Sequence, residues 1–175
     1  EALFPPEPFA DLFAAARKAG LHLTAHAGET GPASNIAGSL TALRSERIDH
    51  GYSVVDDAEL MRRCKDEGVL FTVCPSTAAA MSAWHDLAAP DHAIRQMRDY
   101  GLKLCINSDD PPMLYTDLAN EYVICVEQLK FSIDDVVSSI QVAIEGSWVD
   151  ESLKRRWSHE WMEEIRLLRS ESRHQ

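Results

Sequence analysis

Hydrophobic and polar positions along this chain switch repeatedly between a helical spacing and short, nearly continuous apolar runs. Segment 6–20 places Phe9, Leu12 and Phe13 on one helical face, and Gly20 follows where a helix C-cap is expected. The helical spacing predicts helices over 6–20, 31–45, 56–68 and 90–101. The apolar runs between them predict strands over 21–27, 47–51, 69–75 and 102–108. The last third predicts helices over roughly 113–130, 132–147 and 150–170.

This order of elements predicts an α/β fold. Apolar strands that alternate with helices of about 10–15 residues are typical of a parallel sheet with helices on its faces. No low-complexity segment or flexible linker interrupts the pattern, so residues 1–175 are expected to form a single domain or part of a larger one. Segment 75–90 is the longest stretch without a clear pattern, and we interpret it as a candidate loop over a site.

Composition and charge restrict the class of function. Apolar residues make up 45% of the chain and the formal net charge is −11, so an acidic globular protein is expected rather than one that binds nucleic acid through a basic patch. No apolar run approaches the length of about 18 residues that a membrane span needs. The first residues, EALFPPEPF, do not resemble a signal peptide and lack an initiator methionine, so we expect the chain to begin partway through a larger protein.

The four cysteines favour buried free thiols over a disulfide framework. Cys64, Cys74, Cys105 and Cys125 form no C-x-x-C pair, and two of them lie in predicted strands. This usage is typical of a reducing compartment, so we expect a cytoplasmic protein.

Polar and ionisable residues follow the predicted strands where each one ends. His26 ends the first strand and is followed by Glu29, His50 ends the second, and Asp109 and Asp110 follow the fourth. The third strand ends in Cys-Pro-Ser-Thr. Barrels of alternating strands and helices place their active sites at the carboxyl ends of the strands.

The residue types at these strand ends favour a metal site. Imidazole and carboxylate groups are suitable zinc ligands, and zinc lowers the pKa of a coordinated water. The adjacent aspartates also repel each other unless a cation relieves the repulsion. Taken alone, each residue has an ordinary structural alternative: His26 and His50 as core or loop histidines, and the aspartates as a helix N-cap. The remaining histidines are expected to be surface or packing residues: His22, His85, His92, His159 and His174.

Four motifs in this order, HAGE, RIDHG, CPS and NSDDPP, resemble the adenosine/adenine deaminase family of metal-dependent hydrolases. The resemblance runs from about residue 5 to the end of the chain. It implies that His26 and Asp109 are zinc ligands, that Glu29 protonates a purine ring nitrogen, and that His50 orients and helps deprotonate the attacking water. It also implies that Asp110 hydrogen-bonds the purine at N7.

The same resemblance implies the carboxyl-terminal half of a (β/α)8 TIM-type barrel with extra C-terminal helices. The family uses an H-x-H pair from the first barrel strand as two further zinc ligands, and no such pair occurs in this chain. One Zn²⁺ per complete barrel is therefore expected, with the amino-terminal half supplied by the same or a separate chain. The expected partners are a small purine substrate and this complementary half, with no nucleic acid and no membrane.

The substrate and the function class stay open at this point. Family members usually carry asparagine where this chain has Ala78, in a loop close to where a substituent of the substrate would lie. Adenosine, adenine, an N6-substituted adenine and a modified nucleoside are all consistent with the motifs. Besides purine deamination, the sequence leaves two alternatives open. The chain could belong to a metal-dependent hydrolase that acts on another heterocycle, or form a non-enzymatic half-barrel subunit without a complete zinc site.

Overall fold

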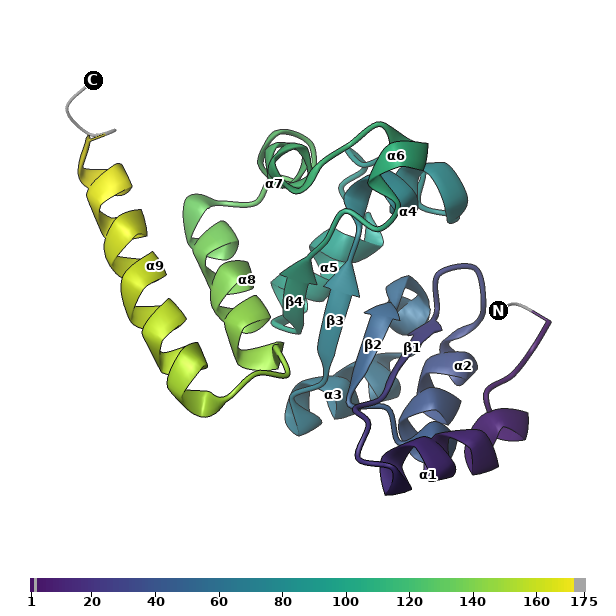
Figure 1. Ribbon diagram of the computed structural model, residues 1–175. Helices are drawn as coiled ribbons and strands as arrows, with labels where there is room; N and C mark the ends of the chain where they lie inside the picture. The colour runs from purple at the N-terminus through teal and green to yellow at the C-terminus, as the bar shows by residue number, and fades with distance from the viewer. Residues whose placement is uncertain (2, 172–175) are drawn as a thin grey trace.

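The computed structural model describes residues 1 and 3–171, and a four-stranded parallel sheet lies at its centre (Figure 1). The strands lie side by side in sequence order, so each crossover connection joins two neighbours. Their bounds are β1 (Thr24–Ala27), β2 (Arg47–His50), β3 (Leu70–Val73) and β4 (Lys103–Ile106). The predicted parallel sheet is confirmed, and each strand is shorter than the segment that the sequence predicts.

The helices also follow the predicted order. Segment 75–90, interpreted above as a candidate loop, begins with a helix, and a short helical turn that was not predicted follows β2. The predicted helix 6–20 begins with a separate short turn over Glu7–Phe9. The helices are α1 (Ala10–Lys18), α2 (Ala33–Gly38), α3 (Ala58–Glu67), α4 (Pro75–Met81), α5 (Ala93–Tyr100), α6 (Pro111–Leu114), α7 (Leu118–Glu127), α8 (Ile133–Gly146) and α9 (Glu151–Glu171). The 3₁₀ and π turns are η1 (Glu7–Phe9), η2 (Ser39–Leu43) and η3 (Tyr52–Asp56).

The two faces of the sheet differ in polarity. Strand register aligns an apolar row across the sheet: Ala25, Ile48, Phe71 and Leu104. The next row is mostly polar: His26, Asp49, Thr72 and Cys105. Because side chains alternate along a strand, these two rows face opposite sides of the sheet.

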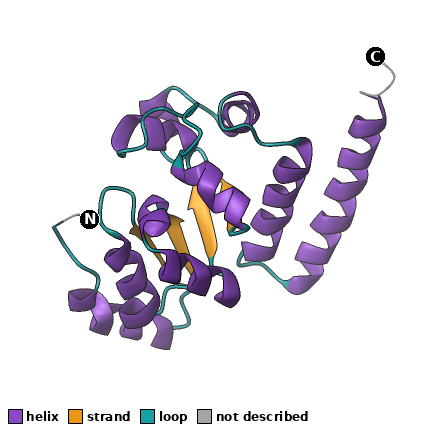
Figure 2. Ribbon diagram, turned by 180° about the vertical axis from the view of Figure 1, so that it is seen from behind, coloured by secondary structure: helices purple, strands orange, loops and turns teal. Residues whose placement is uncertain are grey.

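The apolar row faces the helical layer. Ile48 and Phe71 are fully buried in one core cluster with residues of α3 and α5, among them Cys64 and Met97. Figure 2 shows helices lying across this face of the sheet, and Figure 1, from the opposite side, shows the strands uncovered. The polar row therefore lies on the uncovered face.

Caps fix where individual helices begin and end. Asp57 accepts a hydrogen bond from the Leu60 amide at the start of α3, and Gly68 closes that helix in the left-handed conformation. Ser132 and Asp135 form a reciprocal capping box at the start of α8. These three helix ends are thus fixed by their own local sequence.

The remaining expectations concern thiols, membranes and histidines. All four cysteines are buried and free, as expected. Among the described residues, no helix is both long and apolar enough to cross a membrane. His22 and His85 are exposed and His92 is buried as a packing residue, whereas His174 lies outside the described residues.

Candidate active site

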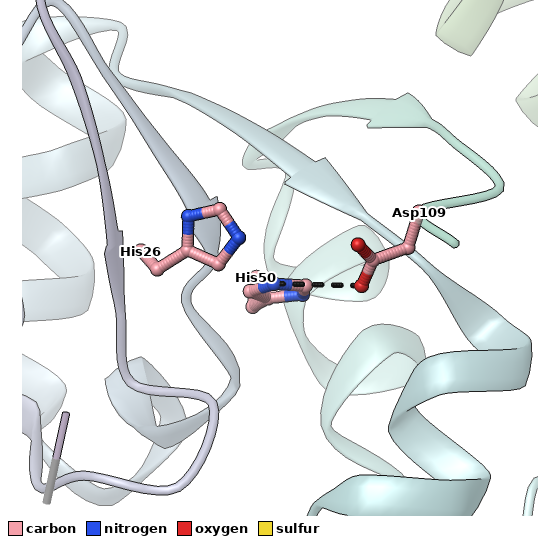
Figure 3. A group of neighbouring side chains, drawn as sticks. All are labelled: His26, His50 and Asp109. Carbon is pink, nitrogen blue, oxygen red and sulfur yellow. Dashed lines mark ion pairs between the residues drawn. The ribbon is translucent and has the colours of Figure 1, made fainter. Parts of the chain in front are cut away.

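The carboxyl ends of the parallel strands bring three of the predicted site residues together. His26 lies on β1, His50 ends β2, and Asp109 follows β4. A ligand atom from each lies within 4.8 Å of the other two, and Figure 3 shows the three side chains converging on one space. Glu29 adjoins the group, with Oε2 at 3.8 Å from His50 Nε2. The structure therefore gathers four of the five predicted residues into one cluster.

His26 reaches the cluster from the uncovered face of the sheet. Its side chain is 62% exposed, and its ring packs edge-on against that of His50 with 4.7 Å between centroids. Its Nδ1 lies 3.7 Å from Oδ2 of Asp49, the residue opposite it on β2. His26 thus has a carboxylate on one side and the cluster on the other.

His50 reaches the cluster through an unusual backbone conformation. It lies two residues after Ile48, so regular strand geometry would turn its side chain toward the helical layer. Its φ of 68° places it in the left-handed region instead, which costs a non-glycine residue about 1–3 kcal/mol. The His50 side chain is only 2% exposed, and Nε2 lies 3.8 Å from Oδ2 of Asp109 as well as from Glu29. Asp109 shares this conformation, with a φ of 56°.

The hydrogen bonds around His50 fix which ring nitrogen carries the proton. The Tyr52 hydroxyl donates to the carbonyl of Cys74 and accepts from the Cys74 amide, both at 3.1 Å. That hydroxyl can then only accept from His50 Nδ1, which lies 3.4 Å away. We therefore assign the proton of neutral His50 to Nδ1, and Nε2 presents its lone pair to Glu29 and Asp109.

Burial shifts the pKa values of two groups in this cluster, Glu29 and His50, in opposite directions. Burial, together with the negative charge of Asp109, raises the pKa of Glu29. Burial, with a contribution from His26, lowers the pKa of His50, although the nearby carboxylates oppose this shift. Both shifts favour the neutral forms, a carboxyl that can donate a proton and an imidazole that can accept one.

The loop that carries Glu29 is held by a residue that the sequence did not single out. The carboxylate of Glu1 accepts hydrogen bonds from the backbone amides of residues 28–31, including those of Gly28 and Thr30. Burial alone would raise the pKa of Glu1, and these four amides bring it below its usual value. Glu1 lies 28 residues from Glu29, and no local motif connects them.

Two further features follow the strands: Asp110 after β4 and the Cys-Pro-Ser-Thr segment after β3. Asp110 is exposed and occupies the N-cap position of α6, as the structural alternative predicted, but its side chain makes no capping hydrogen bond there. Burial raises the pKa of Cys74, which keeps its thiol neutral and a poor metal ligand. Glu121, fully buried on α7, accepts a hydrogen bond from the Ser76 amide and anchors the segment after β3.

Tyr52, Asp49 and Glu121 are further residues that the sequence reasoning missed. A charged residue inside a four-residue strand, Arg-Ile-Asp-His, was a usable signal for Asp49, because buried strands seldom carry a carboxylate without a partner. Tyr52 and Glu121 gave no such signal, since the backbone groups that they hold, at Cys74 and Ser76, lie 22 and 45 residues away.

Comparison with known protein families gives one consistent match. The sequence model of the family described as adenosine deaminase matches residues 1–163. The adenine deaminase of Sinorhizobium medicae is 38% identical over 148 residues, which cover 85% of this chain and 45% of that protein. The adenine deaminase of Cupriavidus taiwanensis is 49% identical over 107 residues, which cover 61% of this chain and 30% of that protein.

Solved structures agree with the sequence relatives. The crystal structure of an adenine deaminase from Arthrobacter aurescens superposes with a TM-score of 0.87 at 35% identity, covering 93% of this chain and 49% of that one. An amidohydrolase from Burkholderia ambifaria, solved with bound zinc, superposes with a TM-score of 0.90 at 34% identity, covering 98% of this chain and 48% of that one.

The chain spans about half the length of the relatives it matches. Its parallel strands and covering helices correspond to the carboxyl-terminal half of a (β/α)8 barrel, with the site residues at the carboxyl ends of the strands. The fold predicted from the sequence is therefore confirmed.

Proposed function

The chain belongs to the adenosine deaminase family, and on that basis we propose that it is the carboxyl-terminal half of a zinc-dependent enzyme of purine metabolism. The proposed reaction is the hydrolytic removal of the 6-amino group from adenine or a closely related 6-aminopurine. The observation that carries this proposal is the convergence of His26, His50 and Asp109 beside Glu29.

The donor set fits a zinc ion. His26 and Asp109 offer one imidazole nitrogen and one carboxylate oxygen, the donor types that zinc prefers. Among the described residues, the ion-pair partners found for Glu29, Asp49 and Asp109 are histidines, so a cation would relieve their mutual repulsion. When bound, zinc would activate water as a nucleophile near neutral pH. One zinc per complete barrel is proposed, with its further ligands supplied by the complementary half.

The chain's own residues account for the proton transfers. Glu29 in its protonated form donates its proton to N1 of the purine as water adds to C6. The lone pair of His50 Nε2 accepts the proton that this water loses. Asp110 hydrogen-bonds the purine at N7 and orients the ring. The proton held by His50 then passes to the amino group, and the C6–N6 bond breaks as ammonia leaves. The hydroxyl at C6 returns its proton to Glu29, which gives the 6-oxopurine.

Adenine is the substrate we propose first. The relatives from Sinorhizobium medicae and Cupriavidus taiwanensis are named adenine deaminases, and so is the solved structure from Arthrobacter aurescens at 35% identity. Adenosine and N6-substituted adenines are the second choice, because the chain has Ala78 where family members usually have asparagine. The four buried thiols favour a reducing compartment, and we propose the cytoplasm.

The test is ammonia release by the full-length protein. We expect release from adenine, its loss after zinc is removed with a chelator, and recovery when zinc is returned. Asp109→Ala should lose both bound zinc and activity, whereas Asp110→Ala should retain zinc and lose kcat/KM. Release from another heterocycle but from no aminopurine would contradict the proposed substrate class, and full zinc occupancy in Asp109→Ala would remove Asp109 from the ligand set.

A further inference from the structure

Asp49 occupies the centre of the polar row on the uncovered face of the sheet. The strand register places it directly opposite His26 on β1 and directly opposite Thr72 on β3. Its side chain is 17% exposed. A carboxylate in this position loses much of its hydration and needs compensating contacts.

Two hydroxyl groups hold this carboxylate in place. Thr24 donates from Oγ1 to Oδ2 of Asp49 at 2.7 Å, and Thr72 donates from Oγ1 to Oδ1. The carboxylate is therefore fixed from both neighbouring strands. In this position Oδ2 of Asp49 lies 3.7 Å from Nδ1 of His26. Among the described residues, His26 is the ion-pair partner found for Asp49.

The orientation of the His26 ring shows how the contact with Asp49 could affect zinc binding. Figure 3 shows the two ring nitrogens of His26 on opposite sides, one turned toward Asp109 and the other away from it. A neutral imidazole has one donor and one acceptor nitrogen. If Nδ1 donates its proton toward Asp49, the lone pair of Nε2 is left free on the side of the cluster.

We propose that Asp49 is a positioning residue for His26, holding its ring in the tautomer and orientation that bind zinc through Nε2. This inference rests on the proposed function, because it requires His26 to be a zinc ligand. Histidine ligands commonly donate their second ring N–H to a carboxylate, which orients the ring and makes the ligand more basic. The pair of threonine hydroxyls adds rigidity to that support.

The chain contains a matched control for this contact. Just before the amino ends of the same two strands, His22 Nδ1 lies 2.8 Å from Oε2 of Glu46. This second histidine–carboxylate pair is exposed and lies outside the cluster of His26, His50 and Asp109. Glu46→Gln therefore removes a comparable pair without touching the site.

The experiment measures the zinc dissociation constant of the full-length protein by competition with a chelator. We expect Asp49→Asn to bind zinc about 10- to 100-fold more weakly than the unmodified protein, and Glu46→Gln to bind it with unchanged affinity. Equal affinity in all three proteins would overturn the proposal. Absence of zinc binding by the unmodified protein would overturn the proposed function itself, which separates the two failures.

A spectroscopic measurement on the unmodified protein tests the same proposal without relying on how well a variant folds. In the unmodified zinc-bound protein labelled with ¹⁵N-histidine, we expect His26 to carry its proton on Nδ1, with a downfield proton resonance typical of a hydrogen bond to a carboxylate. That resonance should move upfield in Asp49→Asn. A His26 protonated on Nε2 in the unmodified protein, or a resonance that stays unshifted in Asp49→Asn, would rule out a positioning role for Asp49.

Discussion

Glu29 and His50 face each other across 3.8 Å with pKa values that burial moves in opposite directions. Burial favours the uncharged form of both, so the pair can hold a proton donor and a proton acceptor side by side. Such a pair is what hydrolysis at a ring carbon needs, because one proton must leave the water and another must reach the ring.

Replacing Glu29 tests its role at the scale of one residue. Glu29→Gln keeps the size of the side chain and removes the transferable proton, so we expect kcat to fall by about 10²- to 10⁴-fold with zinc content unchanged. Steady-state kinetics and metal analysis measure the two quantities. Glu59→Gln, exposed in the first turn of α3, is the control and should leave both unchanged. Zinc loss from Glu29→Gln would mean that Glu29 has a different role.

Sequence reasoning reached His26, Glu29, His50 and Asp109 because each lies at or shortly after the carboxyl end of a strand, and parallel strands bring these ends to one edge of the sheet. The structure places the four together, and their chemical roles stay predictions. Asp49 and the loop contact of Glu1 depend on strand register and on distant segments, which the alternation of apolar and polar positions does not determine.

At the scale of elements, the turn after β2 determines where His50 lies. Gly51 has a φ of 74°, and a Cβ built there would meet the ring of Phe71, a core residue of β3. We expect Gly51→Ala to destabilise the protein by more than about 2 kcal/mol, because it combines left-handed strain with overpacking. Displacement of His50 should also lower kcat. Urea unfolding and steady-state kinetics test both effects.

Gly20 is a control that separates the cost of backbone strain from the cost of side-chain crowding. Gly20 has a φ of 81°, and nothing lies within 4 Å of a Cβ built there. Gly20→Ala should therefore cost only the strain, about 1 kcal/mol, and leave kcat unchanged. Equal losses of stability in the two variants would show that contact with Phe71 does not control the β2 turn.

The start of α5 predicts a dependence of stability on pH. His92 is fully buried, accepts from the Ile94 amide at Nδ1 and donates from Nε2 to the Trp84 carbonyl. Burial lowers its pKa below the usual value, although the bond to Trp84 opposes the shift. Below about pH 6.5 the unfolded chain therefore binds a proton that the folded chain does not, and the free energy of unfolding falls progressively as pH drops from there toward the lower pKa of the folded state.

Urea unfolding between pH 7 and pH 5 measures this effect. His92→Asn keeps a capping acceptor and cannot titrate, so unfolding should take up fewer protons, by at most about one. His85→Gln, in the same connection between α4 and α5 but exposed, should keep the dependence of the unmodified protein. An identical dependence in all three proteins would contradict the assignment to His92.

Element boundaries were predicted less well than element order. Segment 69–75 was expected to be one strand, yet β3 covers only Leu70–Val73, because Pro75 starts α4 directly after it. Proline at a first helical position has its φ already set for a helix, and the alanines that follow favour one. The ambiguous stretch 75–90 therefore begins as a helix for a local reason that the hydrophobic pattern alone does not reveal.

At the scale of the whole molecule, the sheet has two outer strands. Among the described residues, β1 pairs only with β2 and β4 only with β3. A cavity of about 340 Å³ lies beside β1, lined by Phe4, Phe9 and Ala25 among others, and both phenylalanines are exposed. An unpaired strand edge next to exposed aromatic side chains favours association with another sheet or chain.

This geometry predicts how segment 1–175 behaves when it is produced alone. Zinc sites use about four ligands, and the described residues bring only three candidate groups within reach of one ion. We expect the segment alone to bind zinc at least about tenfold more weakly than the full-length protein. Loss of an outer-sphere contact already lowers zinc affinity by about that factor, and loss of a direct ligand lowers it at least as much. We also expect it to self-associate through β1. Chelator competition and light scattering test both, and adding the complementary half in trans should restore zinc affinity and a single stoichiometric complex. A monomeric segment that binds zinc as tightly as the full-length protein would instead place a complete metal site within residues 1–175.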